Sequence, residues 1–254
     1  MASPTSAARG VDWYVQTARL RATRIVEDVR WFAVFDPEHS HSHDGNQLVV
    51  HAPTDADLAR VANEYFADAP HLAITTFADI PVSSVLALQG AGFRRTDFLI
   101  MAADPRDLAS VDPGVAVVEV TEADSAVFQD AIWRVLEPEY TDEVTAELVD
   151  RRKALDLAGL VHRLAVRDAG TIVATCDVVV RDTTAELDAV AVDPAHRQCG
   201  IGDTLIAAAG QIARNSGVDL LVLTALAADW PREWYSRRGF EEVATEQSFV
   251  LDVR

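Results

Sequence analysis

The chain has 254 residues, of which 49% are hydrophobic and 24% charged, and its formal net charge is −18 at pH 7. No apolar run is long enough to cross a bilayer, and an acidic surface repels phosphate backbones, so membrane and nucleic-acid partners are both disfavoured. Residues 1–10 lack the apolar core of a signal peptide, which predicts a disordered tail on a cytoplasmic protein. Cys176 and Cys199 have neither the number nor the spacing of a disulfide framework or a metal site.

The first half reads as alternating helices and strands. Apolar residues recur at helical spacing over residues 11–29, which predicts a helix there. The remaining predicted elements are strands at 31–35 and 47–51, a helix at 55–68, a strand at 71–77, a helix at 82–92 and a long strand at 93–104. Two Asp-Pro steps and a glycine in residues 104–114 then predict a domain boundary.

The second half continues the alternation of strands and helices. Its predicted elements are a strand at 115–120, helices at 124–136 and 142–157, strands at 162–168, 171–182 and 185–192, a helix at 200–215, a strand at 220–226, a helix at 231–238 and a last strand ending at 251. Strands and helices in this order predict an α/β (α+β) fold with a mixed, mostly antiparallel central sheet flanked by helices.

The two halves share a short internal repeat. Gly92-Phe93 and Gly239-Phe240 each follow a strand and a short helix, and each precedes a long strand. Either the halves are two related subdomains, or two unrelated αβ units resemble each other by chance. The first interpretation predicts a tail at 1–10, an N-terminal domain at 11–112 and a C-terminal domain at 113–254.

A glycine-containing loop in the second half is the sharpest local signal. Residues 192–202 follow a predicted strand and open a predicted helix, and they include Gly200 and Gly202. The first amides of a helix are unpaired and lie at the positive end of its dipole, and glycines let the backbone close around a phosphate. No Gly-Lys-Ser/Thr follows, and the spacing is not that of a dinucleotide fingerprint. The loop therefore predicts a different kind of pyrophosphate site, or a turn without a ligand.

Arg197, Gly200 and Gly202 give this loop its resemblance to the GNAT acyltransferases, whose signature is Arg/Gln-x-x-Gly-x-Gly/Ala. The resemblance extends in element order from about residue 115 to 251. It implies acetyl-CoA or another acyl-CoA as co-substrate, with no metal. The residues it implies for binding that co-substrate are Val190, Ala191, Val192, Arg197, Gln198, Cys199, Gly200, Ile201, Gly202 and Asp203.

The resemblance also implies catalytic residues. Tyr235 in WYSRRGF matches the family's Tyr-x-x-x-Gly-Phe, whose tyrosine protonates the leaving thiolate; a core tyrosine is the alternative. Glu186 lies six residues before Val192, where histone-type members carry a general base. Asp188 is two residues further along and faces the same side of the strand. Both carboxylates could instead be solvent-facing charges. A backbone N–H near Val190 would stabilise the oxyanion.

The sequence departs from the family pattern in two places. Ala228 stands where members often carry an asparagine that contacts CoA, which puts the geometry at the pantetheine end in doubt. In the first half, residues 52–57 replace the glycine loop and Leu88 replaces the tyrosine, so that half is expected to be a non-catalytic copy. The histidines at positions 39, 41 and 43 are predicted to lie in a polar turn rather than to bind a metal.

The expected function is N-acyl transfer from acyl-CoA to the primary amine of a small acceptor, which the negative charge would attract if the acceptor is a cation. The protein would act as a monomer or homodimer. Two alternatives stay open. One is a CoA-binding regulatory protein that has lost its chemistry. The other is an acyltransferase whose donor is a carrier protein or an aminoacyl-tRNA.

Overall fold

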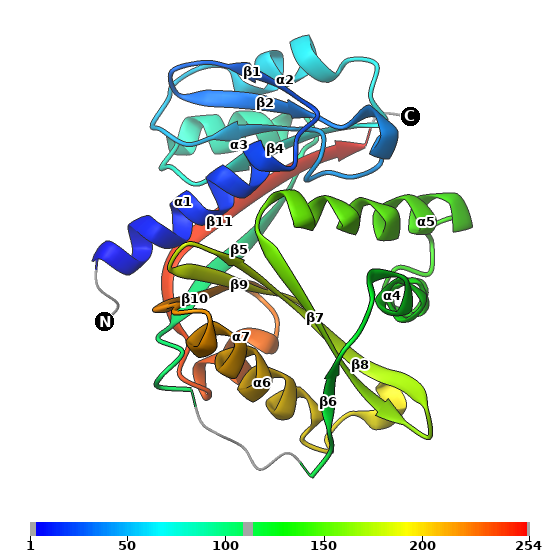
Figure 1. Cartoon of the computed structure of the whole chain (residues 1–254). Helices are drawn as coiled ribbons and strands as arrows, with labels where there is room; N and C mark the ends of the chain where they lie inside the picture. Colours follow the sequence, from blue (N-terminus) through cyan, green and yellow to red (C-terminus); the bar gives the residue numbers. More distant parts are fainter. Residues whose placement is uncertain (1–3, 109–113, 253–254) are drawn as a thin grey trace. The chain divides into compact units, whose positions relative to one another are not determined.

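The computed structural model describes residues 4–108 and 114–252, and the chain forms two compact units (Figure 1). The central unit comprises Met101–Thr224 and Glu233–Glu241. The N-terminal unit comprises Ala2–Ile100, Ala225–Arg232 and Glu242–Arg254. The units are interleaved along the chain, because the last strand returns to the N-terminal unit. The predicted boundary at 104–114 lies partly outside the described residues.

The described part of the N-terminal unit combines a mixed sheet with the α-helices α1, α2 and α3. Its elements are α1 (Pro4–Leu20), β1 (Arg24–Glu27), β2 (Trp31–Phe35), β3 (Gln47–Val50), α2 (Leu58–Phe66), β4 (His71–Thr76), α3 (Val82–Gly90), β5 (Arg94–Ala103) and β11 (Glu241–Asp252). The strand order is β1-β2-β3-β4-β11-β5. The β3–β4 pair is parallel, while β1–β2, β2–β3 and β4–β11 are antiparallel.

The central unit repeats this arrangement with longer strands. Its elements are β6 (Val117–Glu119), α4 (Glu122–Leu136), α5 (Asp142–Asp150), β7 (Leu160–Asp168), β8 (Thr171–Arg181), β9 (Thr184–Val192), α6 (Ile201–Asn215), β10 (Leu220–Leu226) and α7 (Pro231–Ser236). The strand order is β10-β9-β8-β7-β6, and only β9–β10 is parallel among the pairs β6–β7, β7–β8, β8–β9 and β9–β10.

The same sequence of elements therefore occurs twice. β1-β2-β3-α2-β4-α3-β5 corresponds to β7-β8-β9-α6-β10-α7-β11. The Gly-Phe pairs adopt the same geometry, with φ of +96° at Gly92 and +97° at Gly239. Each phenylalanine N–H donates to the carbonyl five residues earlier, from Phe93 to Leu88 and from Phe240 to Tyr235. The repeat seen in the sequence is thus present in the fold, with Leu88 at the position of Tyr235.

The N-terminal segment differs from its prediction. The predicted disordered tail is wrong for residues 4–10, while residues 1–3 lie outside the described residues. The predicted helix at 11–29 is replaced by α1 from Pro4 to Leu20, followed by strand β1. Ile25 and Val26 are β-branched, and β1 pairs with β2 in antiparallel register through a tight turn. Val29 fits the helical spacing by coincidence, since it lies in that turn and is 87% exposed.

Helices cover both faces of the central unit's sheet. All seven residues from Val173 to Val179 of β8 are buried, although successive side chains point to opposite faces. α4 and α6 both pack on β8, and Figure 1 shows them on opposite sides of the strands. Gln129 on α4 donates to Thr175 Oγ1 at 2.8 Å, which assigns Thr175, and with it Asp177, to the α4 face.

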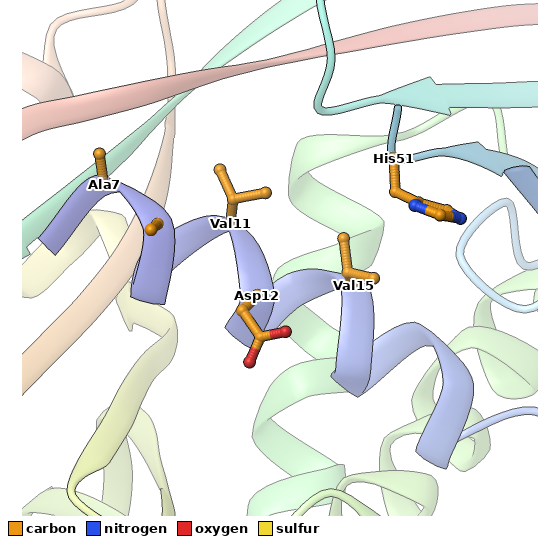
Figure 2. Close-up of a pocket in the computed structure, with 6 residues that line it drawn as sticks. Ala7, Val11, Asp12, Val15 and His51 are labelled. Carbon is orange, nitrogen blue, oxygen red and sulfur yellow. The ribbon is translucent and has the colours of Figure 1, made fainter. Parts of the chain in front are cut away.

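A shallow hollow of about 450 Å³ lies on the N-terminal unit. Figure 2 shows Ala7, Val11 and Val15 along one face of α1, with His51 extending from the end of β3. Asp12 and Ala8 complete its lining. The hollow is an open and mostly apolar depression.

The histidine-containing loop of the N-terminal unit is ordered by Asn46. The Asn46 side chain accepts from the Asp36 N–H and donates to the carbonyls of Asp36, His39 and Ser42. The His43 ring packs edge-on against His71, with centroids 4.4 Å apart. Among the described residues, no group of three or more His, Cys, Asp or Glu side chains is arranged to hold a metal ion.

His71 should make the N-terminal unit sensitive to acid. Burial, and then the neighbouring His43, lower the pKa of His71 from 6.5 to about 4. The unfolded chain takes up a proton near pH 6.5 and the folded chain only near pH 4, so stability is lost as pH falls through this window. Between about pH 7.5 and 5 we expect His71 to account for a loss of roughly 2 kcal/mol in the free energy of unfolding.

Urea unfolding at the two pH values measures this loss in the wild type and in His71→Gln. The glutamine keeps a donor for the Asn46 carbonyl, which the His71 ring contacts at 3.2 Å, but it does not titrate. The variant should lose less stability on acidification. Equal losses in the two proteins would show that His71 is not the acid-sensitive group.

Candidate active site

Strand β9 has one open edge and a bulge. Its parallel pairing with β10 covers Thr184–Glu186, and beyond Glu186 the described residues pair β9 with β8 alone. The β8–β9 register shifts after Asp177↔Asp188, so that Cys176 alone lies opposite Ala189 and Val190. Ala189 has φ +50°, as residues in bulges can. From Leu187 to Val192 the β10 side of β9 therefore has no strand partner in the described part of the chain.

The loop after β9 leads into a helix without a side-chain cap. Gly200 is the N-cap residue of α6 with φ +77°, and as a glycine it makes no side-chain cap hydrogen bond to the first turn. Gln198 also has a positive φ, +63°. A Cβ on Gly200 would meet no atom within 4 Å, so the backbone conformation and not crowding favours glycine. Uncapped amides at the positive end of a 15-residue helix suit an anion.

Two other residues of the loop are held by local contacts. Arg197 Nε donates to the Val192 carbonyl at 3.1 Å, and Cys199 Sγ lies 3.5 Å from the Arg197 carbonyl. Both residues are exposed. The arginine that matches the signature thus closes the loop onto the end of β9, which fixes where the α6 amides lie relative to the strand's open edge.

Helix α7 packs Trp234 and Tyr235 against neighbouring parts of the central unit. A Cβ on Gly202 would lie 2.8 Å from Trp234 Cζ2, so the second glycine of the loop is needed for close packing. Tyr235 is 9% exposed and packs edge-on against Phe240. Burial raises the pKa of Tyr235, and the nearby Cys176 and Asp188 raise it further. Its phenol therefore stays protonated and can serve as a donor.

A partly buried arginine lies among the candidate carboxylates. Arg152 Nη2 bonds Asp177 Oδ2, and its Nη1 lies 3.5 Å from Asp188 Oδ2. Burial lowers the pKa of Arg152, but Asp188, Asp177 and Glu186 more than offset this and raise it overall. Three carboxylates around one guanidinium leave a net negative charge at this place.

The three carboxylates differ in access and in partners. The Asp188 side chain is 36% exposed, while Glu186 and Asp177 are 8% and 1% exposed. Asp188 Oδ1 accepts from the Ala189 N–H at 2.7 Å. Burial raises the pKa of Asp177, and Asp188 adds to the rise while Arg152 opposes it. Of the three, Asp188 is the carboxylate that an incoming cation reaches first.

Sequence reasoning missed Arg152 and Asp177. Arg152 follows α5 in a run of charged residues that reads as a solvated surface, and Asp177 interrupts an apolar strand. A lone aspartate in an otherwise apolar strand was the available signal, because a buried carboxylate requires a partner. The spacing gave no indication that Arg152 is that partner.

The corresponding helix of the N-terminal unit has a different start. Asp57 is the N-cap of α2, and its side chain accepts from the Arg60 N–H at 3.1 Å. A carboxylate therefore occupies the position where α6 leaves its amides uncapped. Leu88, at the place of Tyr235, is an apolar core residue. The first half thus has neither a free anion site nor a proton donor at these positions.

A family comparison agrees with this geometry. Residues 161–242 match the model of the Acetyltransferase (GNAT) domain, a range that includes the loop, the β9 carboxylates and Tyr235. No curated protein matches the sequence.

No helix in the described part of the chain is long and apolar enough to span a membrane.

Solved structures with the same fold cover nearly the whole chain. A conserved protein of unknown function from Staphylococcus epidermidis is 16% identical, with a TM-score of 0.75 over 92% of this chain and 95% of its own. A GCN5-related N-acetyltransferase from Kribbella flavida is 22% identical, with a TM-score of 0.68 over 98% and 96%. A tandem GNAT protein from the clavulanic acid biosynthesis pathway is 12% identical, with a TM-score of 0.58 over 98% and 95%. Residues 161–242 are therefore similar to the GNAT acetyltransferase domain, and the mixed, mostly antiparallel sheet flanked by helices has the fold of solved GNAT proteins that include a tandem member.

Proposed function

We propose that the chain is an N-acyltransferase that moves an acyl group, such as acetyl, from acyl-CoA to the primary amine of a small cationic acceptor in a ternary complex. The observation that carries the proposal is the uncapped start of α6, placed after a strand with an open edge and in the same unit as Tyr235. The family match over residues 161–242 supports the donor.

The donor is proposed to bind along α6 and β9. The amides of residues 198–203 would hold the pyrophosphate, because they lie at the positive end of the helix dipole. The open edge at Val190–Val192 would pair with the amides of the pantetheine arm, as an added strand pairs with a sheet edge. The N–H of Val190, in the bulge, would donate to the oxygen that becomes negative during transfer.

The acceptor is proposed to carry positive charge. An alkylammonium with a pKa of about 10 must lose a proton before it can attack, and the Glu186/Asp188 pair would bind it and pass the proton to water. The neutral nitrogen then bonds to the acyl carbon and the carbon–sulfur bond breaks. The Tyr235 hydroxyl would donate its proton to the departing thiolate, and the second proton that the nitrogen loses as the amide forms would return to Tyr235 through water. The net negative charge around Arg152 favours a cation over a carboxylate-bearing amine.

Release of free thiol from acetyl-CoA tests this function. Diamines, neutral-tailed amines and amino acids are supplied at equal concentration, and we expect rates to fall in that order. If acetyl-CoA binds but no amine releases thiol, a binding protein without chemistry is the better description. If amino acids, which carry a carboxylate, react fastest, the proposal that the acceptor is a cation is wrong.

One acyl-CoA should bind per chain. The Asp57 carboxylate occupies the start of α2, and a phosphate there would meet like charge and capped amides. Titration calorimetry with acetyl-CoA is expected to give a stoichiometry near one, and Asp57→Asn should leave this number unchanged. A value near two would mean that the first half has kept its own donor site.

A further inference from the structure

We propose that Arg238 is a positioning residue for the donor: it neutralises Asp203 and ties the start of α6 to α7. The inference rests on the proposed acyl-CoA binding. The two residues are 35 positions apart in sequence, and both belong to the central unit.

Asp203 poses an electrostatic problem at the proposed pyrophosphate site. It is the acidic residue in the first turn of α6. A carboxylate there stabilises the helix through its dipole, but it also repels a phosphate that approaches the same amides. Because Asp203 does not cap the helix, its charge must be offset by some other group if a doubly charged pyrophosphate is to bind.

Arg238 supplies that offset. Its Nε donates to Asp203 Oδ1 at 2.5 Å, and Nη2 contacts the same oxygen. Nη1 donates to the Trp234 carbonyl at 2.7 Å, and Cζ lies 4.2 Å from the centroid of the Trp234 ring. The guanidinium is therefore fixed from three sides, and the carboxylate oxygen that it holds is charge-paired.

The contacts form a closed path between the two helices. Trp234 packs against Gly202, Arg238 stacks on Trp234, and Asp203 follows Gly202 in the chain. Tyr235 is the residue next to Trp234, so the path also sets where α7 presents the phenol. Arg238 thus acts on the donor through Asp203 and Trp234, not through the reacting atoms.

The pair should matter for binding more than for folding. The Arg238 and Asp203 side chains are 22% and 34% exposed, and solvent screens ion pairs of this kind. A bound pyrophosphate would instead meet the Asp203 carboxylate at short range, where removal of its partner is costly. The expected signature is a changed dissociation constant with a nearly unchanged melting temperature of the free protein.

The experiment is a double-mutant cycle read by calorimetry with acetyl-CoA. Arg238→Gln, Asp203→Asn, the double variant and the wild type are compared, with Arg237→Gln as a control that removes the same charge from an exposed neighbour. We expect Arg238→Gln to weaken binding about tenfold and the double variant to return to within about twofold of wild type. Arg237→Gln should bind as wild type does.

Salt gives a second readout. The loss of acetyl-CoA affinity in Arg238→Gln should become smaller as the salt concentration rises from about 0.05 to 0.5 M, because screening weakens the repulsion of the pyrophosphate by Asp203.

Two binding results would contradict the inference. If Arg238→Gln and the double variant bind acetyl-CoA equally weakly, Arg238 contacts the donor directly and the inference is wrong. It is also wrong if Arg238→Gln binds as wild type does. A wild-type protein that binds no acetyl-CoA would overturn the proposed function and this inference with it.

Discussion

Gly200→Asp is expected to abolish the rise in melting temperature that acetyl-CoA causes in the wild type. At a hundredfold excess over its dissociation constant, a ligand adds about 2.7 kcal/mol by mass action, or roughly 5–10 °C for a chain of this size. The substitution puts a carboxylate at the N-cap of α6, where the proposed pyrophosphate would lie. Thermal unfolding with and without acetyl-CoA measures the shift.

The effect of backbone strain in Gly200→Asp must be distinguished from the effect of the negative charge that the aspartate introduces. Gly200 has φ +77°, so any L-residue there costs about 1–2 kcal/mol. Gly217, just beyond the other end of α6, has φ +74° and equally open surroundings. Gly217→Asp should therefore lower the melting temperature of the free protein at least as much, since a carboxylate is unfavourable at a helix C-terminus, while it keeps the ligand shift. A full shift in Gly200→Asp would show that the donor binds elsewhere.

Tyr235→Phe is expected to lower kcat about ten- to a thousandfold with little change in acetyl-CoA affinity. The lost hydroxyl acts on the leaving thiolate and so belongs to the transition state. The phenylalanine keeps the ring packing on Trp234 and Phe240, with centroids 4.8 and 5.7 Å away, so folding should be unaffected. Steady-state rates of thiol release, together with calorimetry, separate turnover from binding.

The pH dependence adds a check on this role. Because burial raises the pKa of Tyr235, its phenol stays neutral at both pH 7 and pH 9. The factor by which Tyr235→Phe lowers kcat should therefore be the same at the two pH values. Tyr140→Phe is the matched control, since Tyr140 lies on the surface of the central unit and stacks on Trp133. Unaltered turnover in Tyr235→Phe would leave Tyr235 as a core residue only.

The sequence by itself determined the features that depend on residues close to one another along the chain. The loop at 192–202 was recognisable because a strand, a glycine pair and a helix start are encoded within a few residues. The Gly-Phe repeat was recognisable for the same reason, and both pairs adopt one local geometry with φ near +96°. The order of elements followed from apolar periodicity, apart from β1, where Val29 matched the helical period by coincidence.

Tertiary structure alone decided which charges meet. Arg152 reaches Asp177 across 25 positions and Arg238 reaches Asp203 across 35, and neither spacing has a pattern that sequence can show. The bulge at Ala189 likewise depends on the register between β8 and β9. Burial and strand register bring these groups together after the chain has packed. The electrostatics of the candidate site therefore arise from distant residues, while its phosphate-binding loop is local.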